Sequence, residues 1–304
     1  MDGLLVVDKP GGISSHDVVR QVRRLCRQRQ VGHAGTLDPM ATGILLVGVG
    51  AGTRILQFLT DGRKTYRATL KLGQSTDTQD AEGQILAERS WHQLTTTAVE
   101  EVCASFVGEI RQLPPMFSAL KKDGVPLYRL ARQGLEVERQ TREITIFRLQ
   151  LEKIDLPFVT LLVDCSKGTY IRTLCHDIGE ALGCGAHMTA LRRTRSGSFG
   201  EADSVRLDDY AERPDALSLL SLTQGLRDYP VLRVDAEAGH RLGNGVPPAL
   251  ADICDDALPA AGSLVQLHTA DGLLAMARFE PERRQEKRGD FQLIRVFPGS
   301  DGAR

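Results

Sequence analysis

No stretch of the sequence is both long and apolar enough to cross a membrane, which requires about 20 consecutive apolar residues. The amino terminus carries only a short apolar run, residues 3–7, and an acid, Asp2, precedes it. A secretory signal would instead begin with a basic region followed by a longer apolar segment. The sequence therefore predicts a cytoplasmic protein that does not associate with a membrane.

The six cysteines lack the spacing of a metal site or of a redox pair. They occur singly, with no C-x-x-C motif among them. Cys175 and His176 are adjacent, whereas residues that ligate one ion are usually separated by a few positions. We expect free, mostly buried thiols in a reducing compartment and no metal ion.

Motifs for nucleotide binding are also missing. The stretch GVGAGT, residues 48–53, follows an apolar run, but the dinucleotide loop G-x-G-x-x-G requires glycine where Thr53 stands. The sequence contains no G-K-[ST] of a phosphate-binding loop. A nucleotide-binding transferase is therefore disfavoured, no cofactor is expected, and the three glycines are interpreted as turn and helix-packing residues.

Net charge is almost absent, since 38 basic and 39 acidic residues leave −1. Basic residues are nevertheless grouped. Residues 18–29 contain five arginines and no acid, residues 112–142 are net basic, and residues 191–195 add three arginines. Such stripes on a neutral protein fit a polyanionic partner better than a membrane. Alternatively, each stripe is a solvated helix face.

The composition, with 41% hydrophobic and 25% charged residues, is that of a globular protein. Ser14 and Asp17 form a capping signal before an amphipathic pattern, which predicts a helix. Further helices are predicted near residues 53–59, near 95–107 and from 171. Strands are predicted at residues 3–9, 44–49, 64–73, 143–153 and 158–166. Strands and helices do not alternate strictly, so the expected fold class is α+β.

A change of pattern near residues 228–230 marks a second unit. Three short strands are predicted in it, near residues 231–235, 263–268 and 291–297. We therefore divide the chain into a main domain, 1–229, and a small β-rich domain, 230–304. Within the main domain, residues 112–142 are basic and turn-rich, with KKDG as a hairpin tip, which is typical of an arm that clamps a partner.

The stretch GHAGTLDPMATG, residues 32–43, places a carboxylate in a glycine-rich loop before an apolar strand. Its glycines let the backbone bend and let a bulky group approach closely. Pro39 fixes φ directly after Asp38 and disfavours helical geometry at that acid. His33 adds an aromatic side chain that can form hydrogen bonds. The stretch alone fits either a catalytic carboxylate or a plain turn.

Five motifs, taken in their order and at their separations, resemble the TruB family of tRNA pseudouridine synthases. They are KPGGISS at 9–15, GHAGTLDPMATG at 32–43, KTYRATLKLG at 64–73, TDTQDAEG at 76–83 and CSKGTYIRTL at 165–174. The resemblance covers residues 1 to about 200. Beyond residue 230 it is limited to the size and strand pattern of the PUA-like RNA-binding module of the family. The arm at 112–142 resembles the thumb insertion of bacterial members that act without a guide RNA.

This resemblance implies both fold and activity. The catalytic domain should contain a mixed, largely antiparallel sheet flanked by helices. The activity should be isomerisation of uridine to pseudouridine at position 55 in the T-loop of tRNA, with the target nucleotide flipped out of the loop. Neither a guide RNA nor a cofactor is implied, and we expect a monomer because nothing indicates a coiled coil or a large apolar patch. The alternative is an RNA-binding module, a tRNA chaperone, without essential catalysis.

The resemblance also implies the site residues. Asp38 corresponds to the catalytic carboxylate, and Arg172, near the start of a helix, to the guanidinium that supports it. Four residues correspond to contacts with the target base and its loop: His33, Tyr66, Tyr170 and Leu191. Asp80 either aids the site or caps a turn. The chemical role of the carboxylate (attack on the sugar, removal of a ribose proton or addition to the base) stays open.

Overall fold

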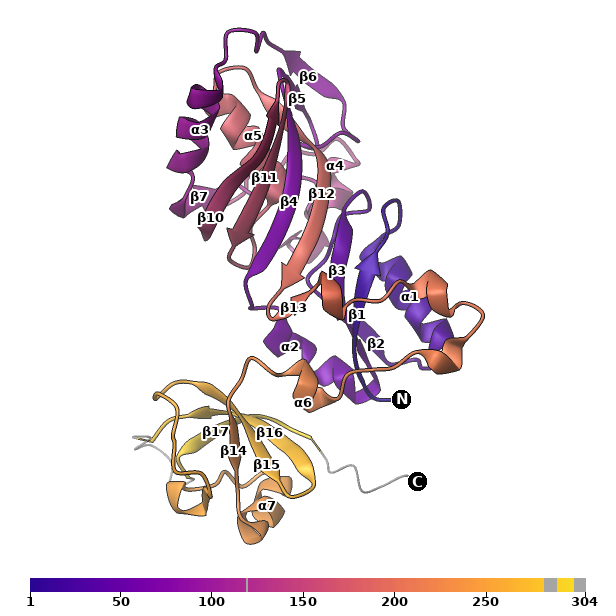
Figure 1. Ribbon diagram of the computed structural model, residues 1–304, viewed down its shortest axis with the longest axis vertical. Helices are drawn as coiled ribbons and strands as arrows, with labels where there is room; N and C mark the ends of the chain where they lie inside the picture. Colours follow the sequence, from indigo (N-terminus) through magenta and orange to yellow (C-terminus); the bar gives the residue numbers. More distant parts are fainter. Residues whose placement is uncertain (119, 282–288, 298–304) are drawn as a thin grey trace.

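Two main β-sheets with helices packed on them, together with two short two-stranded hairpins, form the described part of the protein (Figure 1). The structure is a computed structural model that describes residues 1–118, 120–281 and 289–297. Within these residues the larger sheet has nine strands: β1 (Gly3–Lys9), β2 (Val31–Ala34), β3 (Thr42–Val49), β4 (Lys64–Leu72), β7 (Gly108–Gln112), β10 (Arg142–Asp155), β11 (Phe158–Cys165), β12 (Ala186–Ser196) and β13 (Phe199–Gly200). The helices beside it are α1 (Ser15–Leu25), α2 (Leu56–Leu59), α3 (Thr96–Ser105), α5 (Ile171–Ala181) and α6 (Leu222–Gly225).

The larger sheet contains one parallel junction. Its strand order is β1-β3-β12-β4-β11-β10-β7, with β2 beside β3 and β13 beside β12. Only β3 and β12 pair in parallel within the described sheet, with Arg192 opposite Thr42 and Arg193 opposite Gly43. This junction joins the amino-terminal strands β1, β2 and β3 to the rest of the sheet. The predicted α+β class, with a largely antiparallel sheet flanked by helices, is confirmed.

Helix α1 begins where the capping signal predicts it. The Ser14 hydroxyl accepts a hydrogen bond from the N–H of Asp17 at 3.2 Å, and the Asp17 carboxylate accepts one from the N–H of Ser14 at 2.8 Å. Val18, Val19 and Val22 are buried under the sheet, whereas the five arginines of this segment are exposed. The apolar stripe therefore fixes α1, and with it the loop that follows β1.

The main core lies between the larger sheet and helices α1, α3 and α5. Leu70 and Leu72 of β4 point into it, and Leu174 and Ile178 of α5 belong to the same cluster. Burying each such side chain stabilises the fold by about 1.5–3 kcal/mol. This packing holds α5 rigidly on the sheet, so the first turn of α5, which carries Arg172, has a fixed position.

Strand β12 is a central strand that the sequence analysis does not predict. The interpretation of residues 191–195 as a surface stripe is wrong for Arg193, whose side chain is only 1% exposed. Strand alternation sends Arg192 to the opposite face, where it pairs with Asp8 at 2.9 Å and Glu201 at 2.6 Å. The charges of this segment hid the strand because buried central strands are usually apolar.

The smaller sheet follows the order β14-β15-β16-β17, and α7 (Ala236–Gly243) packs on it. Its strands are β14 (Val231–Arg233), β15 (Leu264–Thr269), β16 (Gly272–Phe279) and β17 (Phe291–Val296). The sequence analysis predicts all of these except the central strand β16. Met276 and Phe297 pack into one apolar cluster with Ile44 and Leu46 of β3, so the two sheets are joined. Residues 282–288 and 298–304 of the predicted domain 230–304 lie outside the described residues.

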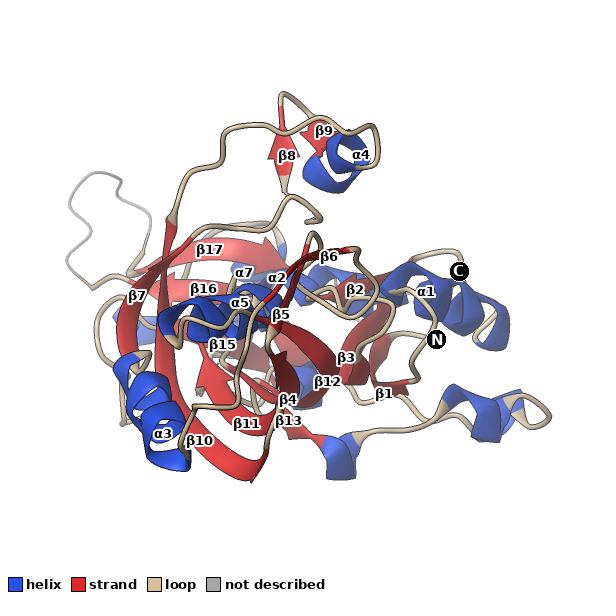
Figure 2. Cartoon of the chain, turned by 90° about the horizontal axis from the view of Figure 1, so that it is seen from above, coloured by secondary structure: helices blue, strands red, loops and turns tan. Residues whose placement is uncertain are grey.

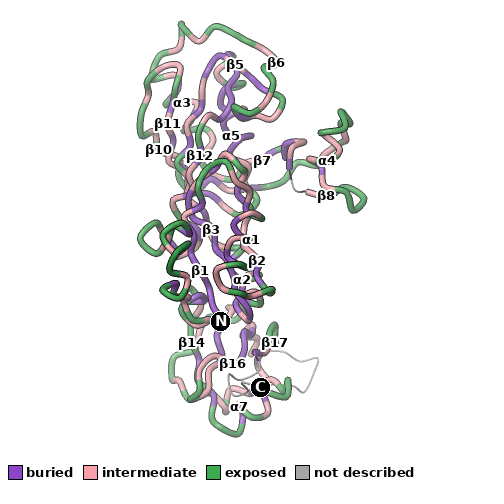
Figure 3. Tube along the Cα trace, turned by 90° about the vertical axis from the view of Figure 1, so that its right-hand side faces the viewer, coloured by how far each residue is buried: buried purple, intermediate pink, exposed green. Residues whose placement is uncertain are grey.

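Of the predicted arm, residues 112–142, the two ends belong to β7 and β10, and the described residues between them, 113–118 and 120–141, project away from the larger sheet (Figures 2 and 3). It carries the short strands β8 (Lys121–Lys122) and β9 (Val125–Pro126), followed by α4 (Leu127–Ala131). Asp123 and Gly124 have φ of 51° and 82°, so the predicted hairpin tip at KKDG is confirmed. A further hairpin of β5 (Gln74–Thr76) and β6 (Ile85–Glu88) follows β4. Among the described helices, none has the length and apolar character to cross a membrane.

Candidate active site

The loop between β2 and β3 has the shape that its glycines predict. Gly35 and Gly43 have φ of 75° and 98°, which an L side chain rarely adopts. A Cβ atom on Gly43 would also collide with the carbonyl oxygen of Arg193, where β3 and β12 pair. These two positions turn the chain sharply on either side of Asp38, so the carboxylate stands on a tightly bent segment.

Two side chains from the start of the chain hold this loop. Lys9 is fully buried, and its ammonium donates to the carbonyl oxygens of Pro10 (2.8 Å), Ile13 (2.6 Å) and Pro39 (3.1 Å). Burial lowers the pKa of Lys9 to about 8. Through Lys9, the motif KPGGISS therefore braces the loop, because the ammonium holds the backbone of Pro39, the residue that follows Asp38.

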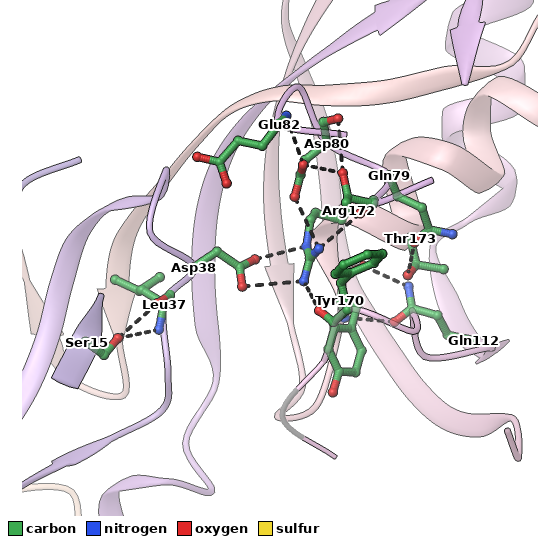
Figure 4. A network of polar contacts seen from close by, with 12 residues as sticks. Ser15, Leu37, Asp38, Gln79, Asp80, Glu82, Gln112, Tyr170, Arg172 and Thr173 are labelled. Carbon is green, nitrogen blue, oxygen red and sulfur yellow. Dashed lines mark hydrogen bonds and ion pairs between the residues drawn. The ribbon is translucent and has the colours of Figure 1, made fainter. Parts of the chain in front are cut away.

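The second brace acts on the residue before Asp38. The hydroxyl of Ser15 donates to the carbonyl of Leu37 at 3.0 Å and accepts from the N–H of Leu37 at 2.9 Å (Figure 4). Both groups are buried, so neither would find water as a substitute. The backbone is thus held on both sides of the carboxylate, by Ser15 at Leu37 and by Lys9 at Pro39.

Arg172, in the first turn of α5, points its guanidinium at Asp38 (Figure 4). Its Nε lies 3.0 Å from Asp38 Oδ2, and its Nη2 donates to Asp38 Oδ1 at 3.4 Å. The other contacts go to the carbonyls of Thr78 (3.0 Å) and Phe117 (2.7 Å) and to the carboxylate of Asp80 (3.2 Å). A planar fork that contacts several acceptors at once has one orientation only, which a lysine could not reproduce.

Asp80 completes this network, and the sequence analysis leaves its role open. Its side chain is 6% exposed, pairs with Arg172 and accepts hydrogen bonds from the Thr78 hydroxyl (2.6 Å) and the N–H of Glu82 (3.1 Å). It therefore closes a turn, as one of the two readings has it, and it also pairs with Arg172, which is consistent with the other. Its presence in the motif TDTQDAEG was the available signal, but its partner lies 92 residues away in the sequence.

The electrostatics of Asp38 combine opposing influences. Burial raises its pKa above the ordinary value of 3.8, the nearby Arg172 acts against this, and the charge of Asp80 adds to the increase. The side chain is still 37% exposed, in contrast to the 6% of Arg172. Asp38 is therefore a solvent-accessible carboxylate paired with a buried cation of fixed orientation, and such a carboxylate can act as a nucleophile or a base.

Tyr66 and Leu191 lie on neighbouring strands of the larger sheet, β4 and β12. Ala68 of β4 is opposite Leu191 of β12, and Tyr66 is opposite Arg193 in the same pairing. Leu191 is 8% exposed and belongs to the main core, while Tyr66 is partly exposed at its border. The ring centre of Tyr66 lies 6.0 Å from the guanidinium carbon of Arg193.

Tyr170 is the N-cap of α5, two residues before Arg172. The side-chain amide of Gln112, at the root of the arm, donates to the carbonyl of Tyr170 at 3.0 Å and accepts from its N–H at 2.8 Å (Figure 4). His33 lies in β2, and burial, with the charge of Arg193 adding to it, lowers its pKa. No hydrogen bond or ion pair in the described part of the chain joins His33 to Asp38 or Arg172.

Comparison with known protein families decides the relationship. The model of the TruB family pseudouridylate synthase N-terminal domain matches residues 23–171, and the tRNA pseudouridylate synthase B C-terminal domain matches residues 172–216. A protein named tRNA pseudouridine synthase B from Syntrophotalea carbinolica is 54% identical over 302 residues, 98% of each chain. The chain belongs to the TruB family. The resemblance stated from the five motifs is therefore confirmed.

Other TruB relatives agree. The protein of the same name from Geobacter sulfurreducens is 50% identical over 257 residues, 83% of this chain and 84% of that one. Among solved structures, the archaeal box H/ACA sRNP Nop10-Cbf5 complex contains a chain that is 26% identical, with a TM-score of 0.75 over 98% of this chain and 87% of its own. An H/ACA RNP bound to a substrate RNA containing 2′-deoxyuridine gives a TM-score of 0.74 at 26% identity, over 98% and 86%.

Proposed function

We propose that this protein isomerises uridine to pseudouridine at position 55 in the T-loop of tRNA, with Asp38 as the catalytic carboxylate. Family membership and the names of the most similar relatives support the reaction and the tRNA substrate. The observation that carries the assignment is the pairing of Asp38 with Arg172, with Nε 3.0 Å from Oδ2. The carboxylate stays accessible there while its partner is buried.

Asp38 must be ionised to act as a nucleophile or a base. Burial opposes ionisation and Arg172 favours it. Because Asp80 and two backbone carbonyls already hold the guanidinium, it requires no rearrangement when charge develops on the substrate. The chain thus supplies a fixed electrostatic setting for a rearrangement that is neither a redox step nor a hydrolysis.

The target nucleotide must leave the folded T-loop, which costs a few kcal/mol. Stacking on an aromatic side chain returns about 1–3 kcal/mol per base. We assign Tyr66 to the face of the uracil, Tyr170 and Leu191 to the walls of its pocket, and His33 to the extruded loop nucleotides. The lowered pKa of His33 supports a neutral ring that can stack and form hydrogen bonds. Such contacts offset the cost of flipping, so no ATP is needed.

We further propose that the protein acts as a monomer and without a guide RNA. The similar solved chains belong to H/ACA particles, but they are only 26% identical, whereas the relatives named tRNA pseudouridine synthase B reach 54%. The projecting arm supports direct recognition of tRNA because it carries Lys121, Lys122 and Arg129 on a segment with few core contacts. Cations placed in this way suit the phosphate backbone.

We also propose the division of the chain into a catalytic domain, 1–229, and a PUA-like RNA-binding domain, 230–304. The separate four-stranded sheet and its own apolar cluster support a boundary near residue 230. The shared cluster of Met276 and Phe297 with the larger sheet supports a fixed attachment rather than a free linker. RNA bound along both domains would then meet one continuous body.

The test is incubation of the purified protein with an unmodified tRNA transcript, followed by carbodiimide modification and primer extension to map any isomerised uridine. A single carbodiimide-dependent stop one nucleotide 3′ of position 55, formed without ATP or added RNA, is the expected result. A matched transcript with cytidine at that position serves as the control. Modification at other sites, or none under conditions where the transcript binds, would contradict the proposal, and the second result would favour an RNA chaperone.

A further inference from the structure

A central strand of the larger sheet carries a buried cation, Arg193, that has no role in the reaction described above. Arg193, on the central strand β12, is 1% exposed and is among the largest fully buried side chains of the described residues. It lies beside the parallel junction of the sheet, opposite Gly43 of β3 and Tyr66 of β4. Its place is therefore between the Asp38 loop and the strand that carries the proposed base-stacking ring.

Arg193 contacts both the Asp38 loop and strand β4. Its Nε donates to the carbonyl of Ile44 at 2.6 Å, and its Nη2 donates to the carbonyl of Gly35 at 2.9 Å. On the other side, its guanidinium carbon lies 6.0 Å from the ring centre of Tyr66. One side chain thus contacts both ends of the Asp38 loop and the aromatic residue of the neighbouring strand.

No carboxylate of the described residues forms an ion pair with Arg193. Fifteen ion pairs occur among the residues that the structure describes, and Arg193 takes part in none of them. A buried cation without an anionic partner destabilises a fold, and an apolar side chain of similar size would avoid that cost.

The field of Arg193 reaches groups on both sides of the site. It contributes to the lowered pKa of His33 in β2 and of Lys9 in the loop brace, although burial is the larger cause for each. It also acts against the burial that raises the pKa of Tyr66. The same cation therefore lies within electrostatic range of three residues that surround the Asp38 loop.

We propose that Arg193 is a positioning residue of the reaction, whose planar guanidinium holds the Asp38 loop and the Tyr66 ring in one fixed relation. Its hydrogen bonds to the carbonyls of Gly35 and Ile44 hold the two ends of the loop, and the guanidinium lies against the ring of Tyr66 and orients it. Among the described residues no hydrogen bond or ion pair joins it to Asp38, so it acts through Gly35, Ile44 and Tyr66. This inference rests on the proposed function, because the relation it fixes is that between the catalytic carboxylate and the stacked base.

The experiment compares Arg193→Lys, Arg193→Ala and the unchanged protein on the tRNA transcript. Single-turnover rates at saturating protein are measured beside tRNA affinity by filter binding, at a temperature where each variant is folded by circular dichroism. We expect each substitution to lower the rate by about 10²-fold, the loss that a misplacement of about 1 Å can cause. Affinity should change far less, because the phosphate contacts remain.

Chemical rescue separates positioning from loss of stability. Guanidinium at non-denaturing, millimolar concentration should restore part of the rate of Arg193→Ala, whereas methylammonium at equal ionic strength should not. Lys64→Met is the matched control, since Lys64 is also a buried cation and, within the described residues, its hydrogen bonds go to the backbone carbonyls of Thr60 and Gly62. It should lower the unfolding midpoint and leave the rate of the folded protein near that of the unchanged one.

The outcomes are distinct. Folded Arg193→Lys with the rate of the unchanged protein overturns the inference. A rate loss in Arg193→Ala that no guanidinium restores and that Lys64→Met shares to the same extent also overturns it, because the effect is then general destabilisation. If the unchanged protein itself forms no pseudouridine in this transcript, the proposed function fails instead.

Discussion

Asp38 and Arg172, 134 residues apart in the sequence, form an ion pair with 3.0 Å between Oδ2 and Nε. The two residues come from opposite sides of the parallel junction between β3 and β12. Asp38 is held by the braces of its loop, and Arg172 by Asp80 and the carbonyls of Thr78 and Phe117. Each partner is thus fixed by contacts independent of the other, so the ion pair forms without RNA.

Arg172→Lys tests the geometry of the cation. The ammonium keeps the charge but is a single point, so it cannot contact Asp38, Asp80 and the Phe117 carbonyl together. We expect a fall in the single-turnover rate of about 10²-fold, with tRNA affinity nearly unchanged. Rapid quench with excess protein measures the rate. A lysine variant as fast as the unchanged protein would show that charge alone suffices.

Asp80→Asn tests the electrostatics of the site through pH. The negative charge of Asp80 raises the pKa of Asp38, so its removal should lower that pKa. Because the proposed mechanism needs ionised Asp38, we expect the rate to rise with pH as its proton leaves, and this acid limb should move to lower pH in the variant. Single-turnover rates across the acidic range measure the limb. A limb that stays in place or moves to higher pH would contradict this assignment.

Substitutions at two adjacent serines, Ser14 and Ser15, distinguish an effect on the position of the Asp38 loop from an effect on the capping of α1. Ser15→Ala leaves buried backbone groups of Leu37 without a partner, which costs about 1–3 kcal/mol, and it loosens the segment that carries Asp38. We expect losses of both stability and rate, measured by urea unfolding and by single turnover.

Ser14→Ala is the matched control for this pair, because it removes only the N-cap of α1, worth about 1 kcal/mol. It should lower stability and leave the rate of the folded protein nearly unchanged. Equal rate losses in the two variants would mean that Ser15 acts only through the stability of the helix.

The arm makes a prediction about salt. Deletion of residues 118–136, replaced by a short glycine linker, should weaken tRNA binding and also flatten its dependence on salt, since each lost phosphate contact reduces the slope of log K against log [salt] by about 0.7–0.9. Filter binding at several salt concentrations measures both. The intact protein should show the steeper slope. Equal slopes for the two proteins would mean that the arm does not contact phosphates.

Local signals in the sequence predict local structure well in this chain. Ser14 and Asp17 fix the start of α1, and Asp123 and Gly124 fix the hairpin tip, because each depends on residues next to it. The family was also readable, since five motifs keep their order and spacing. Such features need no knowledge of distant contacts.

The parts that could not be predicted depend on contacts between distant residues. Strand β12 was hidden because Arg193 is buried by its sheet neighbours, which residue type alone does not reveal. The role of Asp80 depends on Arg172, and that of Lys9 depends on Pro39. From the sequence alone a charged side chain is expected to be exposed. Only the folded structure shows which charged side chains are buried.

The most direct test of the account is Asp38→Asn. Folding raises the pKa of Asp38 above its value of 3.8 in the unfolded chain. Ionisation of Asp38 therefore lowers the free energy of unfolding as the pH rises above 3.8. Because asparagine is neutral, the variant should have an unfolding midpoint at neutral pH at least as high as that of the unchanged protein. We predict that this variant binds the tRNA transcript normally and forms no pseudouridine in single turnover. Product formed at the rate of the unchanged protein would contradict the account.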